Sequence, residues 1–157
     1  GLLSAFVSML GLGGMLQFYS SMIPKELFNI IFQMITMKNM ALIFLLLIPL
    51  NIFVGSLLLS ISIFSKSFKE AQSLANPFMI IIIIPVYLGM MPGIELNFST
   101  AIIPILNVTL ATKELLAGTL SNYLLLVVIM SQIIIAIGAI SFCKAWFNRE
   151  ETLFRST

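Results

Sequence analysis

The sequence contains no histidine, no aspartate and a single cysteine, Cys143. One cysteine cannot form a disulfide within the chain, and the Cys/His spacings of zinc sites are absent. Without histidine and aspartate, a Ser-His-Asp or Cys-His catalytic set cannot be assembled from these residues. All six acidic residues are glutamates, so an intramembrane aspartyl protease or metalloprotease also lacks its groups. These absences exclude the commonest hydrolase chemistries for this chain.

Charged residues are also scarce. They make up 9% of the 157 residues, whereas 60% are hydrophobic, and the mean hydropathy is +1.13. A soluble domain of this size could not bury so much apolar surface, but a lipid bilayer can solvate it. The formal net charge of +2 is too small to indicate a nucleic-acid partner. The composition therefore predicts a membrane protein whose main surroundings are the lipid bilayer.

Four apolar stretches are long enough to cross a hydrocarbon core of about 30 Å. The fold class is thus predicted to be all-α, a polytopic membrane protein that forms a single transmembrane domain over residues 1–157. Asn51, two residues after Pro49, should hydrogen-bond to another helix or to a carbonyl that the proline releases. Because the chain starts inside an apolar run without a methionine, we expect it to be part of a longer protein. The four predicted transmembrane helices cover residues 1–23, 41–64, 74–91 and 122–147.

The segments between these spans differ in kind. In residues 24–40 the polar side chains fall on one helical stripe, which predicts a helix lying in the membrane interface; a loop with an apolar bias is the alternative. Residues 92–121 contain an apolar stretch too short to span, and then a second short helix expected from about Asn107 to Ala117, with Gly118 as its stop. Two short helices predict an external re-entrant hairpin, which survives at membrane depth only if protein buries it or it faces a watery cavity.

Basic residues give the predicted orientation. Ser67 and Glu70 have the spacing of a capping box before the third span, and Lys66 and Lys69 lie beside them. Cytoplasmic flanks of membrane helices tend to be basic. Of the eight basic residues, five fall on the side of this turn and the C-terminus and three on the other side: Lys66, Lys69, Lys144, Arg149 and Arg155 against Lys25, Lys38 and Lys113. We therefore expect the turn inside and residues 24–40 and 92–121 outside.

Three motifs carry a family resemblance. They are SFKEAQS at 67–73, GMMPGIELN at 89–97 and PILNVTLATKELLAGT at 104–119, and the tail FNREETLFR at 147–155 adds to them. Together and in this order they resemble the membrane subunit of ABC-2 type transporters, in particular the sodium-efflux permease branch. The similarity covers most of the chain from about Ala41 onward. The chain departs from that branch at Leu74, where an aromatic residue is usual.

The resemblance implies a six-helix permease whose third to sixth helices are the four spans described above. It implies a functional unit of two permease copies and two ABC ATPase subunits in the bacterial cytoplasmic membrane, where ATP hydrolysis drives alternating access and the efflux of sodium or another small cation. The chain has no G-x-x-x-x-G-K-[ST] loop, so ATP and Mg²⁺ would belong to the partner ATPase. The chain is therefore expected to carry no cofactor and not to be an enzyme. A non-transporting membrane scaffold is the alternative function; an intramembrane enzyme would need groups from outside this chain.

Two sets of polar residues are candidate functional sites. Lys66, Lys69 and Glu70 could contact the ATPase, although a solvated interfacial turn explains them equally well. Within the re-entrant segment, four residues carry oxygen atoms that suit a hard cation, and helix capping with interfacial charge is their structural alternative. These four candidates for the translocation path are Asn107, Thr109, Thr112 and Glu114.

Overall fold

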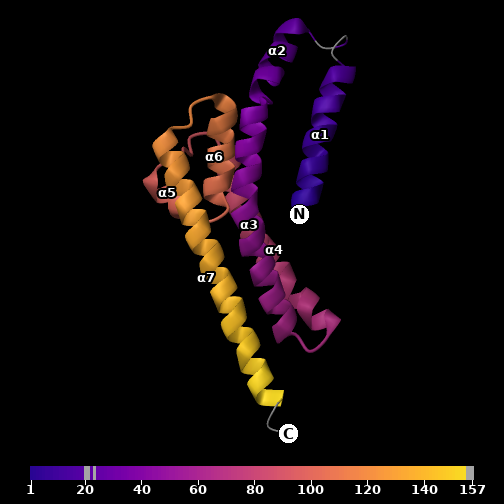
Figure 1. Ribbon diagram of the computed structural model, residues 1–157, viewed down its shortest axis with the longest axis vertical. Coiled ribbons are helices and arrows are strands. Elements are labelled where there is room, and N and C mark those ends of the chain that lie inside the picture. The colour runs from indigo at the N-terminus through magenta and orange to yellow at the C-terminus, as the bar shows by residue number, and fades with distance from the viewer. Residues whose placement is uncertain (20–21, 23, 155–157) are drawn as a thin grey trace.

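The computed structural model describes residues 1–19, 22 and 24–154, with side chains up to residue 148. Over these residues the chain is helical and contains no strand, as the composition predicts (Figure 1). The helices in chain order are α1 (Leu2–Phe18), α2 (Lys25–Met34), α3 (Met37–Phe64), α4 (Phe68–Met90), α5 (Phe98–Ile102), α6 (Leu106–Ala117) and α7 (Asn122–Phe154).

Within the described part of the chain, three helices are long and apolar enough to cross a membrane. They are α3, α4 and the Asn122–Asn148 part of α7. The prediction of an all-α, multi-pass membrane protein is thereby confirmed at this coarser level. One boundary differs from the predicted one, because α3 begins at Met37 rather than at residue 41. α4 begins at Phe68, directly after the predicted cap Ser67, and so includes the residues between the cap and the apolar run 74–91.

The first of the four predicted spans, residues 1–23, is not confirmed as a membrane-crossing helix. Its helical part, α1, has 17 residues, or about 25 Å at 1.5 Å per residue, which is shorter than a hydrocarbon core. Residues 20, 21 and 23 lie outside the described part of the chain. α1 packs against the first half of α3, with the rings of Phe6 and Phe44 6.2 Å apart.

The predicted interfacial helix, residues 24–40, is shorter than expected. α2 ends at Met34, and Thr36 adopts an extended conformation as the N-cap of α3. The hydroxyl of Thr36 donates to the carbonyl of Gln33 at 2.7 Å, and Asn39 Nδ2 donates to the carbonyl of Met34 at 3.0 Å. These bonds satisfy carbonyls that the end of α2 leaves free. The predicted single helix over 24–40 is therefore divided into α2 and the start of α3.

The two ends of the bundle are different in character. At one end the Ser65–Ser67 loop joins α3 to α4, and the ring of Phe64 lies 6.1 Å from that of Trp146 on α7; we call this the turn end. At the other end α5 and α6 fold back against α4, α3 and α7, and we call this the hairpin end (Figure 1). The main buried cluster lies there: Leu46, Leu96, Ala101, Leu106, Val108, Leu110, Ala111 and Val128.

The hairpin is the part of the segment 92–121 in which sequence and structure agree best. α6 runs from Leu106 to Ala117, and Gly118 follows it with a left-handed φ of 73°, as predicted for the stop of this helix. α5, at five residues, is far too short to span a membrane. An additional feature is a capping box, in which Asn97 Oδ1 accepts from the Thr100 N–H and Thr100 Oγ1 accepts from the Asn97 N–H.

Candidate functional site

The corner between α5 and α6 is strained. Ile105 has φ 71° and ψ −52°, and the Leu106 N–H donates to the carbonyl of Pro104 at 2.8 Å. This is a γ-turn with positive φ at its centre, a rare conformation that is especially unfavourable for a β-branched residue. Ile105 is nevertheless buried. Such strain costs about 1–3 kcal/mol and persists only where the surrounding contacts enforce it, so the corner is held by its neighbours.

Asn107 completes the hydrogen bonding of this corner. Nδ2 donates to the carbonyl of Ala101 at 3.0 Å, and Oδ1 accepts from the N–H of Val108 at 2.8 Å. The Asn107 side chain is fully buried. The first N–H groups of a helix have no intrahelical partner, and here each finds one inside the protein. Asn107 thus ties α5 to α6 and makes a buried helix start tolerable.

A second amide connects this corner to α7. Gln132 Nε2 donates to Asn107 Oδ1 at 2.7 Å, and both side chains are fully buried. A carbonyl can only accept and an N–H can only donate, so Ala101 and Val108 determine the orientation of the Asn107 amide. Because Asn107 Oδ1 can only accept, the Gln132 amide must turn its Nε2 toward that oxygen. This leaves Gln132 Oε1 buried without a hydrogen-bond donor among the described residues, which is a costly arrangement.

Ser131 lies next to Gln132 and makes longer contacts to the same corner. Its Oγ is 3.4 Å from the carbonyl of Ile102 and 3.5 Å from Asn107 Nδ2. At these distances the bonds are weak. Among the hydrogen bonds between the hairpin and α7, the Asn107–Gln132 bond is therefore the strong one, and it adds to the packing of Val128 in the buried cluster.

On its opposite side α6 is in close contact with the last turn of α4. Gly89 is buried, and a Cβ added to it would lie 2.6 Å from Thr109 Cγ2 and 2.9 Å from Thr109 Cβ. The Thr109 hydroxyl donates to the carbonyl of Ile105 at 2.9 Å and so faces its own helix. The absence of a side chain at Gly89 allows α4 and α6 to approach closely.

Lys113 and Glu114 bind the loop that precedes α5. Lys113 Nζ donates to the carbonyls of Met91 and Ile94, both at 3.2 Å, and Glu114 Oε1 accepts from the N–H of Leu96 at 2.8 Å. These residues border a partly polar pocket of about 470 Å³ at the hairpin end, lined by Gly93, Ile94, Glu95, Leu96, Lys113, Glu114, Ala117 and Thr119.

The four predicted path residues do not converge on one point. At about 100° per residue, Asn107 and Glu114 share one face of α6, whereas Thr109 and Thr112 lie on the other. Asn107 faces α7, Thr109 faces α4, and Glu114 holds the loop. Thr112 is half-buried. Gln132, which the sequence marks only as a polar residue within an apolar span, is the partner that brings Asn107 into a cross-helix contact.

The predicted contact residues of the ATPase lie at the turn end. Ser67 Oγ accepts from the N–H of Glu70 at 3.3 Å, as expected for the N-cap of α4. Glu70 Oε2 accepts from the N–H of Lys66 at 2.8 Å, one residue earlier than in a standard capping box. Lys66 and Lys69 are exposed and Glu70 is half-buried. Arg155, counted among the basic residues on this side, lies outside the described part of the chain.

No protein-family model, no curated protein and no solved structure matches this chain. Within the described residues, no group of three or more His, Cys, Asp or Glu side chains could hold a metal ion. The candidate site is therefore defined by geometry alone: a strained helical hairpin anchored to the spanning helices at one end, and an exposed basic turn at the other.

Proposed function

We propose that this chain is the membrane-spanning permease part of an ATP-driven ABC-2 type exporter. The observation that carries the proposal is the position of the motifs along α4. The SFKEAQS motif forms the N-cap and the first turns of α4 at the turn end, and the GMMPGIELN motif begins at Gly89, where α4 meets α6. A single helix thus connects the expected contact of the ATPase with the hairpin that contains the third motif.

This connection supports a mechanism of coupling. A partner ATPase that moves the turn end displaces the start of α4, and the displacement reaches α6 through the close contact of Gly89 with Thr109. The backbone at Ile105 is strained, and neighbouring contacts hold it in its present conformation. When those contacts shift, the strain favours a second arrangement of the hairpin. Alternating access then corresponds to movement of the hairpin relative to α7.

The layout that we propose in the membrane is the one that the sequence predicts. α1 is the fourth span, α2 lies in the interface, and the α5–α6 hairpin is re-entrant from the outside of the bacterial cytoplasmic membrane. Two copies of the permease and two ATPase subunits form the working assembly, and ATP and Mg²⁺ are bound by the ATPase.

The substrate we propose is sodium or another small cation. Oxygen atoms of Asn107, Thr109, Thr112 and Glu114 are suitable ligands for a hard cation. The pocket that Glu114 lines is partly polar and lies at the hairpin end. It would be the exit on the outer side, whereas the buried Asn107 would be reached only after the hairpin moves.

The test is co-purification of an ATP-binding subunit with the protein in mild detergent. Replacement of Lys66, Lys69 and Glu70 by alanine should abolish the association. The matched control replaces the same residue types, two lysines and one glutamate, at the opposite end: Lys25, Lys38 and Glu26. The control should retain the ATPase, because α2 and the start of α3 lie away from the turn end.

Other outcomes are equally informative. An ATPase retained by both variants would keep the exporter and place the main contact elsewhere. Loss in both variants would indicate nonspecific damage by the triple substitution. If no ATP-binding partner accompanies the unmodified protein, a membrane scaffold without transport becomes the better interpretation.

A further inference from the structure

Two oxygen atoms at the corner between α5 and α6 lack a strong hydrogen-bond donor among the described residues. The first is Gln132 Oε1, which belongs to a fully buried side chain. The second is the carbonyl of Ile102, the last residue of α5. In a continuing helix this carbonyl would accept from the Leu106 N–H, but that N–H donates to the carbonyl of Pro104 instead. The strained turn therefore leaves the Ile102 carbonyl without its helical donor.

Ser131 and Asn107 connect these two oxygens. Ser131 Oγ lies 3.4 Å from the Ile102 carbonyl and 3.5 Å from Asn107 Nδ2, and both contacts are too long to be strong. In the same Asn107 amide, Oδ1 accepts from Gln132 Nε2 at 2.7 Å. The Ile102 carbonyl, the Ser131 hydroxyl and the Gln132 amide thus form one cluster, in which the oxygen acceptors are short of donors.

A cluster that has oxygen acceptors to spare suits a cation. A cation accepts several oxygen ligands at once, and interrupted membrane helices coordinate sodium through carbonyl oxygens in this way. The cluster contains no carboxylate: α5 has no acidic residue, and Glu114 of α6 lies about 10 Å along the helix axis from Asn107. A buried divalent ion would leave two charges uncompensated there, which is the costlier arrangement. A small monovalent cation is therefore the ligand that fits.

We propose that Gln132 Oε1, Ser131 Oγ and the carbonyl of Ile102 bind a small monovalent cation such as sodium. This inference rests on the cation substrate proposed above, and it moves the inner binding site from α6 to the contact between α5 and α7. Asn107 Oδ1 already accepts from Val108 and Gln132, so Asn107 mainly orients the Gln132 amide. Because the ligands come from both the hairpin and α7, cation binding holds the hairpin against α7.

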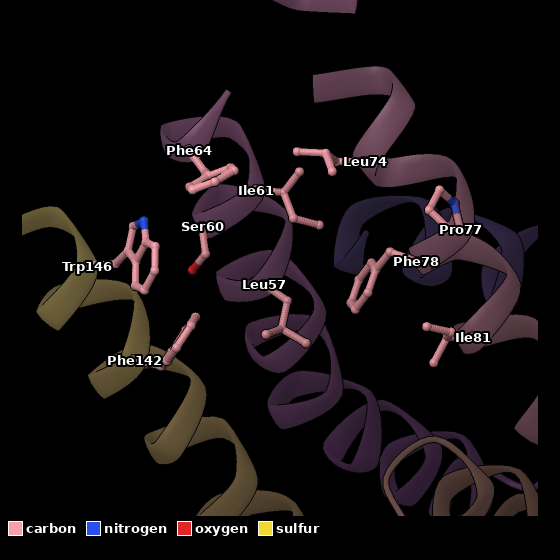
Figure 2. A pocket seen from close by; sticks show the side chains of 10 residues that line it. All are labelled: Leu57, Ser60, Ile61, Phe64, Leu74, Pro77, Phe78, Ile81, Phe142 and Trp146. Carbon is pink, nitrogen blue, oxygen red and sulfur yellow. The ribbon is translucent and has the colours of Figure 1, made fainter. Parts of the chain in front are cut away.

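A hydroxyl at the turn end provides a matched control. Ser60 of α3 lines an apolar groove together with residues such as Phe142 and Trp146 (Figure 2). Its hydroxyl donates to the carbonyl of Ser56 in the same helix at 2.8 Å. Among the described residues that line this groove, Ser60 has the only side-chain oxygen. Its removal should therefore leave cation binding unchanged.

Thermal unfolding of the full chain in detergent tests the site. Sodium chloride is titrated against choline chloride at the same total concentration, because choline is a much larger monovalent cation and keeps the ionic strength constant. At about ten times its Kd, sodium should raise the Tm of the unmodified protein by about 3–6 °C. Gln132→Leu should abolish this shift, while its Tm in choline chloride stays at or above that of the unmodified protein. That combination separates a lost ligand from a damaged fold.

Two serine variants compare the site with its control. Ser131→Ala should weaken sodium binding about fivefold, as expected for the loss of one oxygen ligand, whereas Ser60→Ala should not change it. Equal sodium shifts in Gln132→Leu and the unmodified protein would overturn the proposal.

Two other outcomes distinguish this site from the proposed function. A shift that Gln132→Leu keeps and Glu114→Gln abolishes would overturn the site and place the cation at the pocket lined by Glu114. The absence of any shift in the unmodified protein, as expected if water satisfies Gln132 Oε1, would overturn the site as well. The exporter role is decided separately, because the unfolding experiment contains no ATPase.

Discussion

The hydrogen bond between Asn107 and Gln132 joins two buried amides, yet the two residues should respond very differently to substitution by leucine. Asn107→Leu leaves three buried groups without their present partner: the Ala101 carbonyl, the Val108 N–H and Gln132 Nε2. Each unsatisfied buried group costs about 1–3 kcal/mol. The total loss in the free energy of unfolding should therefore be about 3 kcal/mol or more.

Gln132→Leu breaks fewer hydrogen bonds than Asn107→Leu and also removes an unsatisfied buried oxygen. It breaks the bond to Asn107 Oδ1, and such interhelical bonds contribute about 0.6 kcal/mol on average in membrane proteins. Asn107 Oδ1 keeps the Val108 N–H as its donor. The substitution also eliminates the orphaned Gln132 Oε1, whose burial costs about 1–3 kcal/mol. We expect stability between that of the unmodified protein and about 2 kcal/mol above it.

Thermal unfolding in detergent measures this contrast. For 1 kcal/mol the Tm of a protein of this size shifts by about 2–4 °C, so Asn107→Leu should lower it by about 6–12 °C or more. Gln132→Leu should leave the Tm unchanged or raise it by up to about 4–8 °C. The double variant should be more stable than Asn107→Leu alone, because the stranded Gln132 Nε2 disappears with its side chain. Equal losses in the two single variants would refute the reasoning about donors and acceptors.

Two other predictions concern packing and topology. Gly89→Ala should destabilise the protein by about 1–3 kcal/mol, because the new methyl group would overlap Thr109, whereas Gly55→Ala, with no neighbour within 4 Å, should stabilise α3 by about 0.5–1 kcal/mol. Chemical denaturation in detergent separates the two outcomes. Single cysteines at Ser67 and Ser99, in a chain whose native cysteine is replaced by serine, should react with an impermeant reagent from opposite sides of the membrane; labelling from one side would eliminate the proposed layout.

The helical framework could be predicted from the sequence because its causes are local. Apolar length gives α3, α4 and α7, and the spacing of Ser67 and Glu70 gives the N-cap of α4. Gly118 follows the general preference for glycine in a left-handed helix stop. Each of these inferences depends on one continuous stretch of sequence and needs no partner from elsewhere in the chain.

The parts that could not be predicted depend on distant partners or on backbone geometry. Asn107 and Gln132 are 25 positions apart, and nothing in the intervening sequence indicates that they meet. The γ-turn at Ile105 contradicts the preference of a β-branched residue, so tertiary contacts must impose it. Asn51 was expected to bond another helix or a carbonyl freed by Pro49. Instead its Nδ2 donates to the carbonyl of Leu47 at 2.8 Å within α3, one turn away.

The ring contacts of Trp146 have a consequence for spectroscopy. It is the only tryptophan in the chain, and its neighbours Phe64 and Phe142 both lie at the turn end. Its fluorescence therefore reports on that end of the bundle, while the hairpin lies too far away to change the surroundings of the indole directly. A change in emission caused by a ligand at the hairpin would consequently require movement of the helices between them. When this single tryptophan is excited selectively over the three tyrosines, its emission thus separates local binding from motion transmitted along the bundle.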